Sequence, residues 1–81
     1  MQFKNENELY STIGKNIKFY REKAKLTQMK LAELSGISIS YLTKIEALKC
    51  NKSISLAVLN NIANTLNIDI KKFLEKENCY D

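Results

Sequence analysis

Histidine and proline are absent from this 81-residue chain, and cysteine and glycine occur only twice each. Because Cys50 and Cys79 lie far apart and there is no histidine, the usual structural zinc sites are excluded, and we expect neither a metal nor a cofactor. No G-x-x-x-x-G-K-[ST] or G-x-G-x-x-G motif is present to bind phosphate. The longest apolar run, Leu56 to Leu59, is too short to span a membrane.

The two isolated cysteines also indicate the cellular compartment of the protein. Two unpaired cysteines, in a chain with no recognisable signal peptide, indicate a reducing compartment. We therefore expect a cytoplasmic protein with no membrane contact.

Charge is unevenly distributed along the chain. The net charge is +4, and residues 11–52 carry the whole basic excess, while both ends are slightly acidic. A basic patch of this kind is typical of a protein that binds a polyanion, although a solvated lysine-rich surface would give the same composition.

The composition indicates one small helical domain. Hydrophobic residues make up 44% and charged residues 27%, which fits a folded chain rather than a disordered one. The scarcity of glycine and proline favours helices joined by short turns. Since 81 residues are close to the minimum for a self-supporting core, we expect well-packed helices, an oligomer, or both.

Apolar spacing and capping residues predict an all-α fold of five helices. Apolar residues at spacings of three and four, Ile13, Ile17, Tyr20 and Ala24, predict a first helix from Ser11 to about Lys25. The four others are expected at Gln28 to about Ser35, Ile39 to about Ala47, Ser55 to about Asn67, and a short one after Asp69. Residues 1–10 are predicted to be a flexible or partly helical arm, 11–76 the domain, and 77–81 a tail.

The second and third predicted helices have the dimensions of a helix-turn-helix. Thr27 and Ser38 are suitable N-caps, and Gly36 suits a left-handed residue at the end of the second helix. Leu31, Ala32 and Leu34 are expected to supply its buried side.

A longer pattern of residues runs through these helices. Its members are Ile13-Gly14, Ile17, Tyr20-Arg21, Leu26-Thr27-Gln28, Leu31-Ala32, Ser35-Gly36-Ile37-Ser38, Tyr41-Leu42, Lys44-Ile45-Glu46, Ser55, Leu59, Ile62-Ala63 and Leu66. In this pattern the chain resembles the phage-repressor-like helix-turn-helix domains of the XRE, or Cro/repressor, type. The resemblance implies a compact five-helix bundle that acts as a sequence-specific transcriptional regulator and binds double-stranded operator DNA as a homodimer.

The resemblance also assigns roles to individual residues. The third helix, about residues 39–47, would enter the major groove. Its candidate base-reading residues are Ile39, Ser40, Thr43 and Lys44. The candidates for contact with the phosphate backbone are Thr27, Gln28, Ser38, Tyr41 and Lys49. For several of these residues a structural role is open as well: Thr27 and Ser38 as caps, Ile39 and Tyr41 as core residues, and Lys44 as an ordinary surface lysine.

Two further pairs of residues are assigned differently. The family places an arginine and a glutamate at Arg21 and Glu46 as an ion pair between the first and third helices, so we expect a structural role for both. Phe73 and Leu74 on the fifth helix are candidates for a dimer interface, or they complete the monomer core.

Other functions remain open at this stage. The chain could be a protein-interaction module, such as an antitoxin or an anti-repressor with a regulatory protein partner, or the controller protein of a restriction–modification operon. An enzyme is the least supported class, because without histidine no acid–base or nucleophilic group of residues is assembled.

Overall fold

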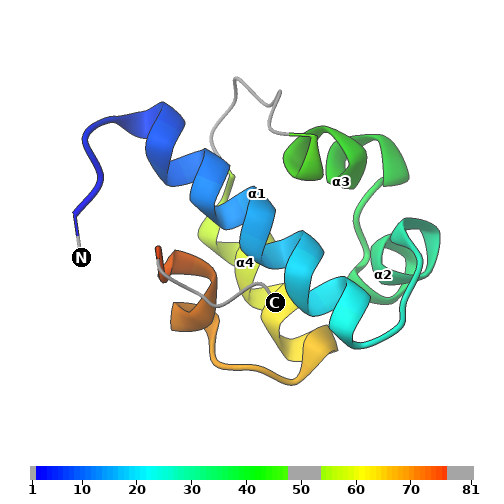
Figure 1. The fold of residues 1–81 in the computed structure, drawn as a ribbon. Coiled ribbons are helices and arrows are strands. Elements are labelled where there is room, and N and C mark those ends of the chain that lie inside the picture. The colour runs from blue at the N-terminus through cyan, green and yellow to red at the C-terminus, as the bar shows by residue number, and fades with distance from the viewer. Residues whose placement is uncertain (1, 48–53, 77–81) are drawn as a thin grey trace.

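Four α-helices and one short 3₁₀ helix make up the fold of the residues that the structure describes (Figure 1). A computed structural model describes residues 2–47 and 54–76. The elements are α1 (Glu6–Lys23), α2 (Gln28–Ser35), α3 (Ile39–Glu46), α4 (Leu56–Leu66) and η1 (Ile70–Leu74). The predicted all-helical fold is confirmed, and its fifth helix is a 3₁₀ helix rather than an α-helix. No helix in the described ranges is long and apolar enough to cross a membrane.

The N-caps predicted at Thr27 and Ser38 form, and Ser55 caps α4 in the same way. The hydroxyls of Thr27, Ser38 and Ser55 accept hydrogen bonds from the backbone N–H groups three residues later, at 3.0 to 3.1 Å. Each bond satisfies one of the amides that a helix leaves free in its first turn. These caps fix the starts of α2, α3 and α4 within the range predicted from sequence.

Helix α1 begins at Glu6, five residues before its predicted start. The Asn5 side chain caps it by accepting from the N–H of Glu8 at 2.9 Å, and the acidic Glu6 and Glu8 stabilise the positive end of the helix dipole. Lys76 donates to Glu8 Oε1 and to the Gln2 carbonyl at 2.6 Å each, which ties the start of α1 to the segment after η1. This bond from Lys76 lowers the pKa of Glu8.

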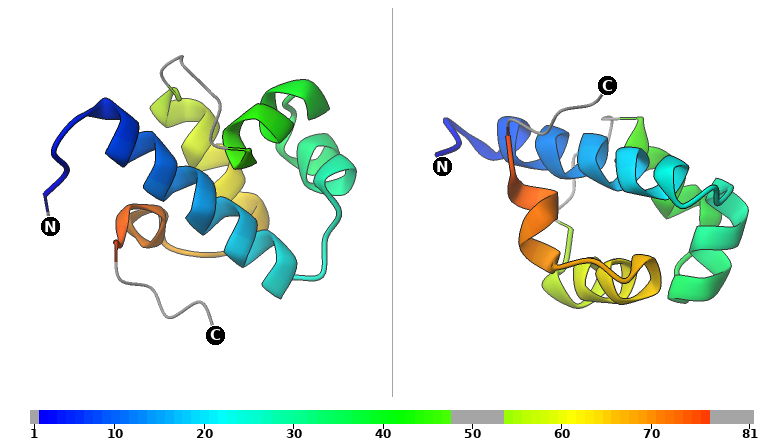
Figure 2. Two further views of the ribbon diagram at one scale, coloured as in Figure 1. Left: turned by 45° about the horizontal axis from the view of Figure 1, so that its top comes forward. Right: turned by 60° about the horizontal axis from the view of Figure 1, so that its bottom comes forward.

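The core lies between α1 and α4 and is closed by η1 (Figure 2). Its fully buried apolar side chains are Ile17, Leu31, Leu42, Ile45, Ile62 and Phe73. Buried Asn16 on α1 donates from Nδ2 to the carbonyls of Phe73 and Glu75 at 2.7 and 2.9 Å, which holds η1 against α1. Each buried apolar residue of this kind contributes about 1.5–3 kcal/mol to folding.

Leu34 and Ala24, which belong to predicted apolar faces, are exposed, and Phe73 takes the second of its two predicted roles, in the core. Phe73 is completely buried in the monomer, so it has no surface to offer a partner, and its alternative role in the core is the one observed. Leu74 is half-buried against the same core. Leu34 is 53% exposed, because the buried stripe of α2 runs through Leu31 and Ser35, four residues apart, and Leu34 lies to its side. Ala24, the C-cap of α1, is exposed rather than buried.

Three helices end with the same left-handed turn. Gly36, as predicted, has φ 73° and ends α2, and Asn67 with φ 57° ends α4. At the end of α1 this position is Lys25, with φ 62°. The N–H groups of Lys25 and Leu26 donate to the carbonyls of Glu22 and Arg21, so the turn satisfies the last carbonyls of α1. Unlike glycine, lysine is strained in this conformation.

We expect Lys25→Gly to stabilise the protein by about 0.5–1 kcal/mol, because it relieves this strain at some cost in unfolded-state entropy. Urea unfolding monitored by circular dichroism would measure the change. Lys25→Ala removes the same charge but keeps the strain. Equal stabilisation by both variants would therefore show that charge, and not backbone conformation, limits stability here.

Candidate nucleic-acid interface

Helices α2 and α3 form a helix-turn-helix with a three-residue turn, Gly36–Ser38. The N–H of Ile37 donates to the Ala32 carbonyl at 3.0 Å, and half-buried Ile37 packs against the core. Ser38 then caps α3. The turn is thus fixed by the left-handed conformation of Gly36, the hydrogen bond of Ile37 and the cap of Ser38. This turn sets the direction of α3 relative to α2.

One side of α3 is buried and the other faces solvent. Leu42, Ile45 and Glu46 are buried. The four candidate base-reading residues all lie on the solvent side, and they are Ile39, Ser40, Thr43 and Lys44. Ile39 is 41% exposed, so it is not a core residue. The structure therefore brings the four predicted residues together on one exposed face.

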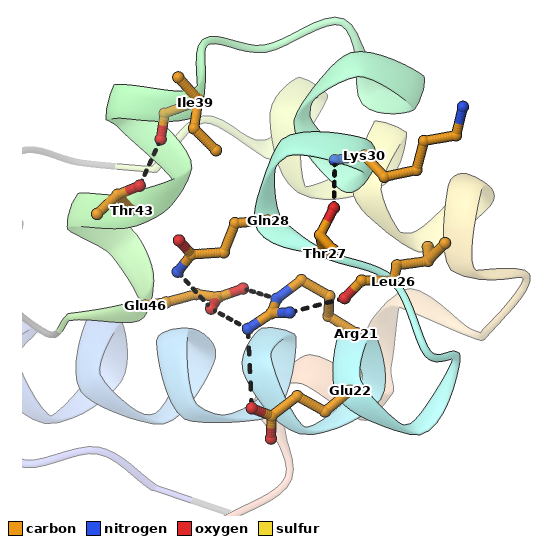
Figure 3. A network of polar contacts seen from close by, with 9 residues as sticks. All are labelled: Arg21, Glu22, Leu26, Thr27, Gln28, Lys30, Ile39, Thr43 and Glu46. Atoms are coloured by element: carbon orange, nitrogen blue, oxygen red, sulfur yellow. Dashed lines mark hydrogen bonds and ion pairs between the residues drawn. The ribbon is translucent and has the colours of Figure 1, made fainter.

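The orientation of Thr43 is set by a bond within α3. Its hydroxyl donates to the Ile39 carbonyl at 2.7 Å (Figure 3). With its proton committed to the backbone, the hydroxyl retains only lone pairs for a ligand, together with the γ-methyl group. Lys44 is exposed, and the structure shows no ion pair between it and residues 2–47 or 54–76.

The residues predicted to contact the phosphate backbone differ in exposure. Thr27 and Ser38 are exposed caps, and a hydroxyl that accepts a capping bond still has a proton to donate. Tyr41 is half-buried at the edge of the core. Lys49 lies outside the described residues.

Gln28 contacts Glu46 rather than pointing freely into solvent. Its Nε2 donates to Glu46 Oε1 at 3.0 Å, which links the first residue of α2 to the last residue of α3. The family resemblance implies two roles for Gln28, a contact with the phosphate backbone and bracing of the recognition helix, and this bond is of the second kind.

The carboxylate of Glu46 also binds the guanidinium group of Arg21 (Figure 3). Arg21 Nε and Nη2 donate to the two carboxylate oxygens of Glu46 at 2.7 and 2.9 Å, a bidentate pair. The two side chains are only 9% and 2% exposed. Arg21 Nη1 donates to the Leu26 carbonyl at 2.7 Å, and the carboxylate of Glu22 lies 3.9 Å from Nη2. Hydrogen bonding to Glu46 raises the pKa of Arg21.

This network joins three parts of the molecule: α1, the start of α2 and the end of α3. No buried side-chain nitrogen or oxygen in the described part of the chain is left without a hydrogen-bond partner. Arg21 and Glu46 therefore hold the buried side of α3 against the domain. Each side chain compensates the charge of the other. Neither is available to a ligand.

The described residues give no support for a metal site. Within the described ranges, no group of three or more His, Cys, Asp or Glu residues could hold a metal ion. The exposed face of α3 presents donors, acceptors and methyl groups together.

The fold and this surface define a helix-turn-helix protein. The profile of the helix-turn-helix family matches residues 17–73, well over half of the chain, and the chain belongs to this family. It is of the XRE, or repressor-like, type, a class of DNA-binding transcriptional regulators, so the resemblance seen in the sequence is confirmed.

Two curated relatives are similar in sequence. The immunity repressor protein of Bacillus phage phi105 is 39% identical over 66 residues, which cover 82% of this chain and 44% of the repressor. The chain thus spans less than half the length of that relative. Control protein C.SmaI of Serratia marcescens is 27% identical over 70 residues, covering 86% of this chain and 81% of C.SmaI.

Two solved structures are similar in fold. The crystal structure of the restriction-modification controller protein C.AhdI from Aeromonas hydrophila matches with a TM-score of 0.72 and 26% identity, over 79% of this chain and 94% of C.AhdI. The hypothetical transcription factor NHTF from Neisseria matches with a TM-score of 0.77 and 21% identity, over 93% and 84% of the two chains. The second likeness supports the fold alone.

Proposed function

We propose that this chain regulates transcription by binding an operator in double-stranded DNA as a homodimer, with α3 in the major groove. The exposed face of α3 carries the proposal. Its four outward side chains stand on a helix that the Arg21–Glu46 pair fixes from behind. An α-helix about 10–12 Å across fits a major groove about 12 Å wide.

Each residue of this face has a chemical counterpart in the groove. Lys44 would donate to O6 and N7 of guanine, and Ser40 would donate to or accept from several bases. The Ile39 side chain and the Thr43 methyl would pack on the C5-methyl of thymine. The hydrogen bond from Thr43 to the Ile39 carbonyl supports this role, because it leaves the methyl group as the main contact. Since Asn, Gln and Arg are absent from the set, apolar contacts and DNA shape would contribute a larger share of specificity.

The ends of the two helices would position the domain on the DNA backbone. The hydroxyls of Thr27 and Ser38 can donate to phosphate while they cap α2 and α3. The free amides of the first turn of α2, which starts at Gln28, carry the positive end of the helix dipole. Such contacts set register and affinity but not sequence preference.

Binding as a dimer would give the two-fold symmetry of an operator with inverted half-sites. Occupying the operator blocks or recruits polymerase, without catalysis by this chain. We place this activity in the cytoplasm, where the operator is accessible.

A controller protein of a restriction–modification operon is a second candidate. It is favoured by the likeness to the restriction-modification controller protein C.AhdI, 94% of which is covered, and by the likeness to control protein C.SmaI, 81% of which is covered. A binding site found upstream of a restriction–modification gene pair would support this candidate, whereas sites beside unrelated genes only would count against it.

The salt dependence of binding separates a DNA regulator from a pure protein-interaction module. Lysines that neutralise phosphates release counterions, so we expect the affinity for duplex DNA to fall steeply as salt rises. Fluorescence anisotropy with a labelled duplex of mixed sequence would measure it. Negligible binding even at low salt would instead favour an antitoxin or anti-repressor whose partner is another protein.

A further inference from the structure

Lys25 is in a backbone conformation that lysine rarely adopts. Its φ is 62°, and the only other described residues with a positive φ are Gly36 and Asn67. Glycine takes this left-handed conformation freely and asparagine is enriched in it, whereas a long side chain is strained there. Glycine in place of Lys25 would form the same backbone hydrogen bonds without this strain. The turn itself therefore does not explain the lysine.

The dipole of α1 does not explain Lys25 either. A basic residue near the end of a helix stabilises the negative end of the dipole, and Arg21 and Lys23 already lie in the last turn of α1. Lys25 itself is exposed, and the structure shows no ion pair between it and the other described residues. What lysine adds at this turn is a positive charge exposed to solvent.

This charge is carried by a segment that hydrogen bonds hold in place. The N–H of Lys25 donates back to α1 at 2.9 Å, and that of Leu26 donates to the Arg21 carbonyl at 3.1 Å. Arg21 Nη1 donates in turn to the Leu26 carbonyl at 2.7 Å (Figure 3), and Thr27 then caps α2. The same guanidinium group holds α3 through Glu46. The network that positions α3 therefore also fixes the backbone of Lys25.

We propose that Lys25 contacts a phosphate group of the DNA backbone beside the start of α2, an inference that rests on the DNA binding of the proposed function. Thr27, which is proposed to donate to phosphate, lies two residues away, at most about 7 Å along the chain. The flexible four-carbon stem of lysine reaches across most of that distance, and its ammonium group binds phosphate as a point charge. Lysine at this position thus lowers the stability of the turn and raises the affinity for DNA. Backbone strain of this kind is typical of functional sites.

Lys23 is the matched control for this contact. It is exposed and lies only two residues from Lys25, so its loss changes the net charge of the chain by the same amount. Its ammonium group, however, lies 5.8 Å from the centroid of the Phe19 ring, one turn back along α1. Lys23→Ala therefore removes a nearby charge without changing the segment that leads into α2.

Binding of the full chain to a labelled duplex of mixed sequence, measured by fluorescence anisotropy at several salt concentrations, tests the contact. We expect Lys25→Gly and Lys25→Ala to bind at least about threefold more weakly than the unmodified chain, with a salt dependence reduced by about one ion. Lys25→Arg keeps the charge and should retain most of the affinity. Lys23→Ala should stay within about twofold of the unmodified chain, because it changes only the long-range attraction.

Urea unfolding of the same variants separates the contact from an effect on folding. Lys25→Gly relieves the strain and should be more stable than the unmodified chain, although it binds DNA more weakly. Lys25→Ala keeps the strain and should lose the same affinity without the gain in stability. A loss of affinity in a stabilised variant cannot come from unfolding.

Three results would overturn the proposal: unchanged DNA affinity of Lys25→Gly and Lys25→Ala, an equal loss in Lys23→Ala, or a Lys25→Arg variant that binds as weakly as Lys25→Ala. Each of them leaves the unmodified chain bound to DNA, so each contradicts the Lys25 contact and not the proposed function. An unmodified chain that does not bind the duplex even at low salt would instead contradict the proposed function, and this contact with it.

Discussion

Replacing Arg21 with alanine should destabilise the protein by about 3–5 kcal/mol, a large part of the stability of a domain this small. The carboxylate of Glu46, 2% exposed, would lose both of its bonds to Arg21 and retain only the one from Gln28. Leaving a buried charge without its partner costs more than the intact pair contributes. The free energy of unfolding from urea denaturation measures this directly.

Two variants identify the cause of the loss. Glu22→Gln removes a mostly exposed carboxylate that lies 3.9 Å from Arg21, and it should change stability by less than about 0.5 kcal/mol. The double variant Arg21→Met, Glu46→Leu removes both buried charges and should recover much of the stability lost in Arg21→Ala. If Arg21→Ala unfolds like the unmodified protein and only its DNA affinity falls, the assignment of Arg21 to structure is incorrect.

Replacing Lys44 with alanine should weaken operator binding by about 1–3 kcal/mol per half-site, or about 5- to 150-fold. Lys44 is exposed in the last turn of α3, on the face that we place in the groove. If it reads a base, the variant should lose preference at one position of the half-site while its affinity for unrelated DNA changes less. Competition binding on an operator selected from random DNA, with each base varied in turn, would measure both effects.

Lys30→Ala is the matched control for Lys44→Ala, because it removes the same charge from exposed α2, where Lys30 pairs with Glu33 at 3.3 Å. It should lower affinity modestly and equally for all sequences. A Lys44→Ala variant that behaves in the same way, with a salt dependence reduced by about one ion and unchanged base preference, would reassign Lys44 to the phosphate backbone.

The start and end of α2 and the start of α3 could be predicted from sequence because each is marked by a residue with a local role. Thr27 and Ser38 are caps, and Gly36 takes the left-handed position. The start of α1 was missed because Asn5 lies in a polar segment where no apolar periodicity marks the helix. There the Asn5 cap and the bond from Lys76 to Glu8 hold the first turn of the helix.

Burial was harder to predict than the helices themselves. Leu34 has an apolar side chain at a helical spacing from Leu31, but the direction in which α2 packs decides which side is covered, and Ser35 is buried instead. Phe73 was ambiguous in sequence, since an apolar residue in a short helix suits either a core or an interface. Its burial depends on Asn16 holding η1 against α1, a contact over 57 residues.

The candidate site came mainly from family resemblance, and the structure added contacts that resemblance did not specify. That Ile39, Ser40, Thr43 and Lys44 share one face follows from helical spacing. The bond from Thr43 to the Ile39 carbonyl depends on a rotamer, which the sequence does not determine.

Selection of the purified protein against random duplex DNA, followed by sequencing of the bound pool, tests the central claim most directly. A dimeric operator-binding protein should enrich an inverted repeat whose half-sites are centred about one helical turn, about 34–36 Å, apart. Ser40→Ala and Lys44→Ala should then alter preference within each half-site. A pool with no enriched sequence would contradict sequence-specific recognition by α3.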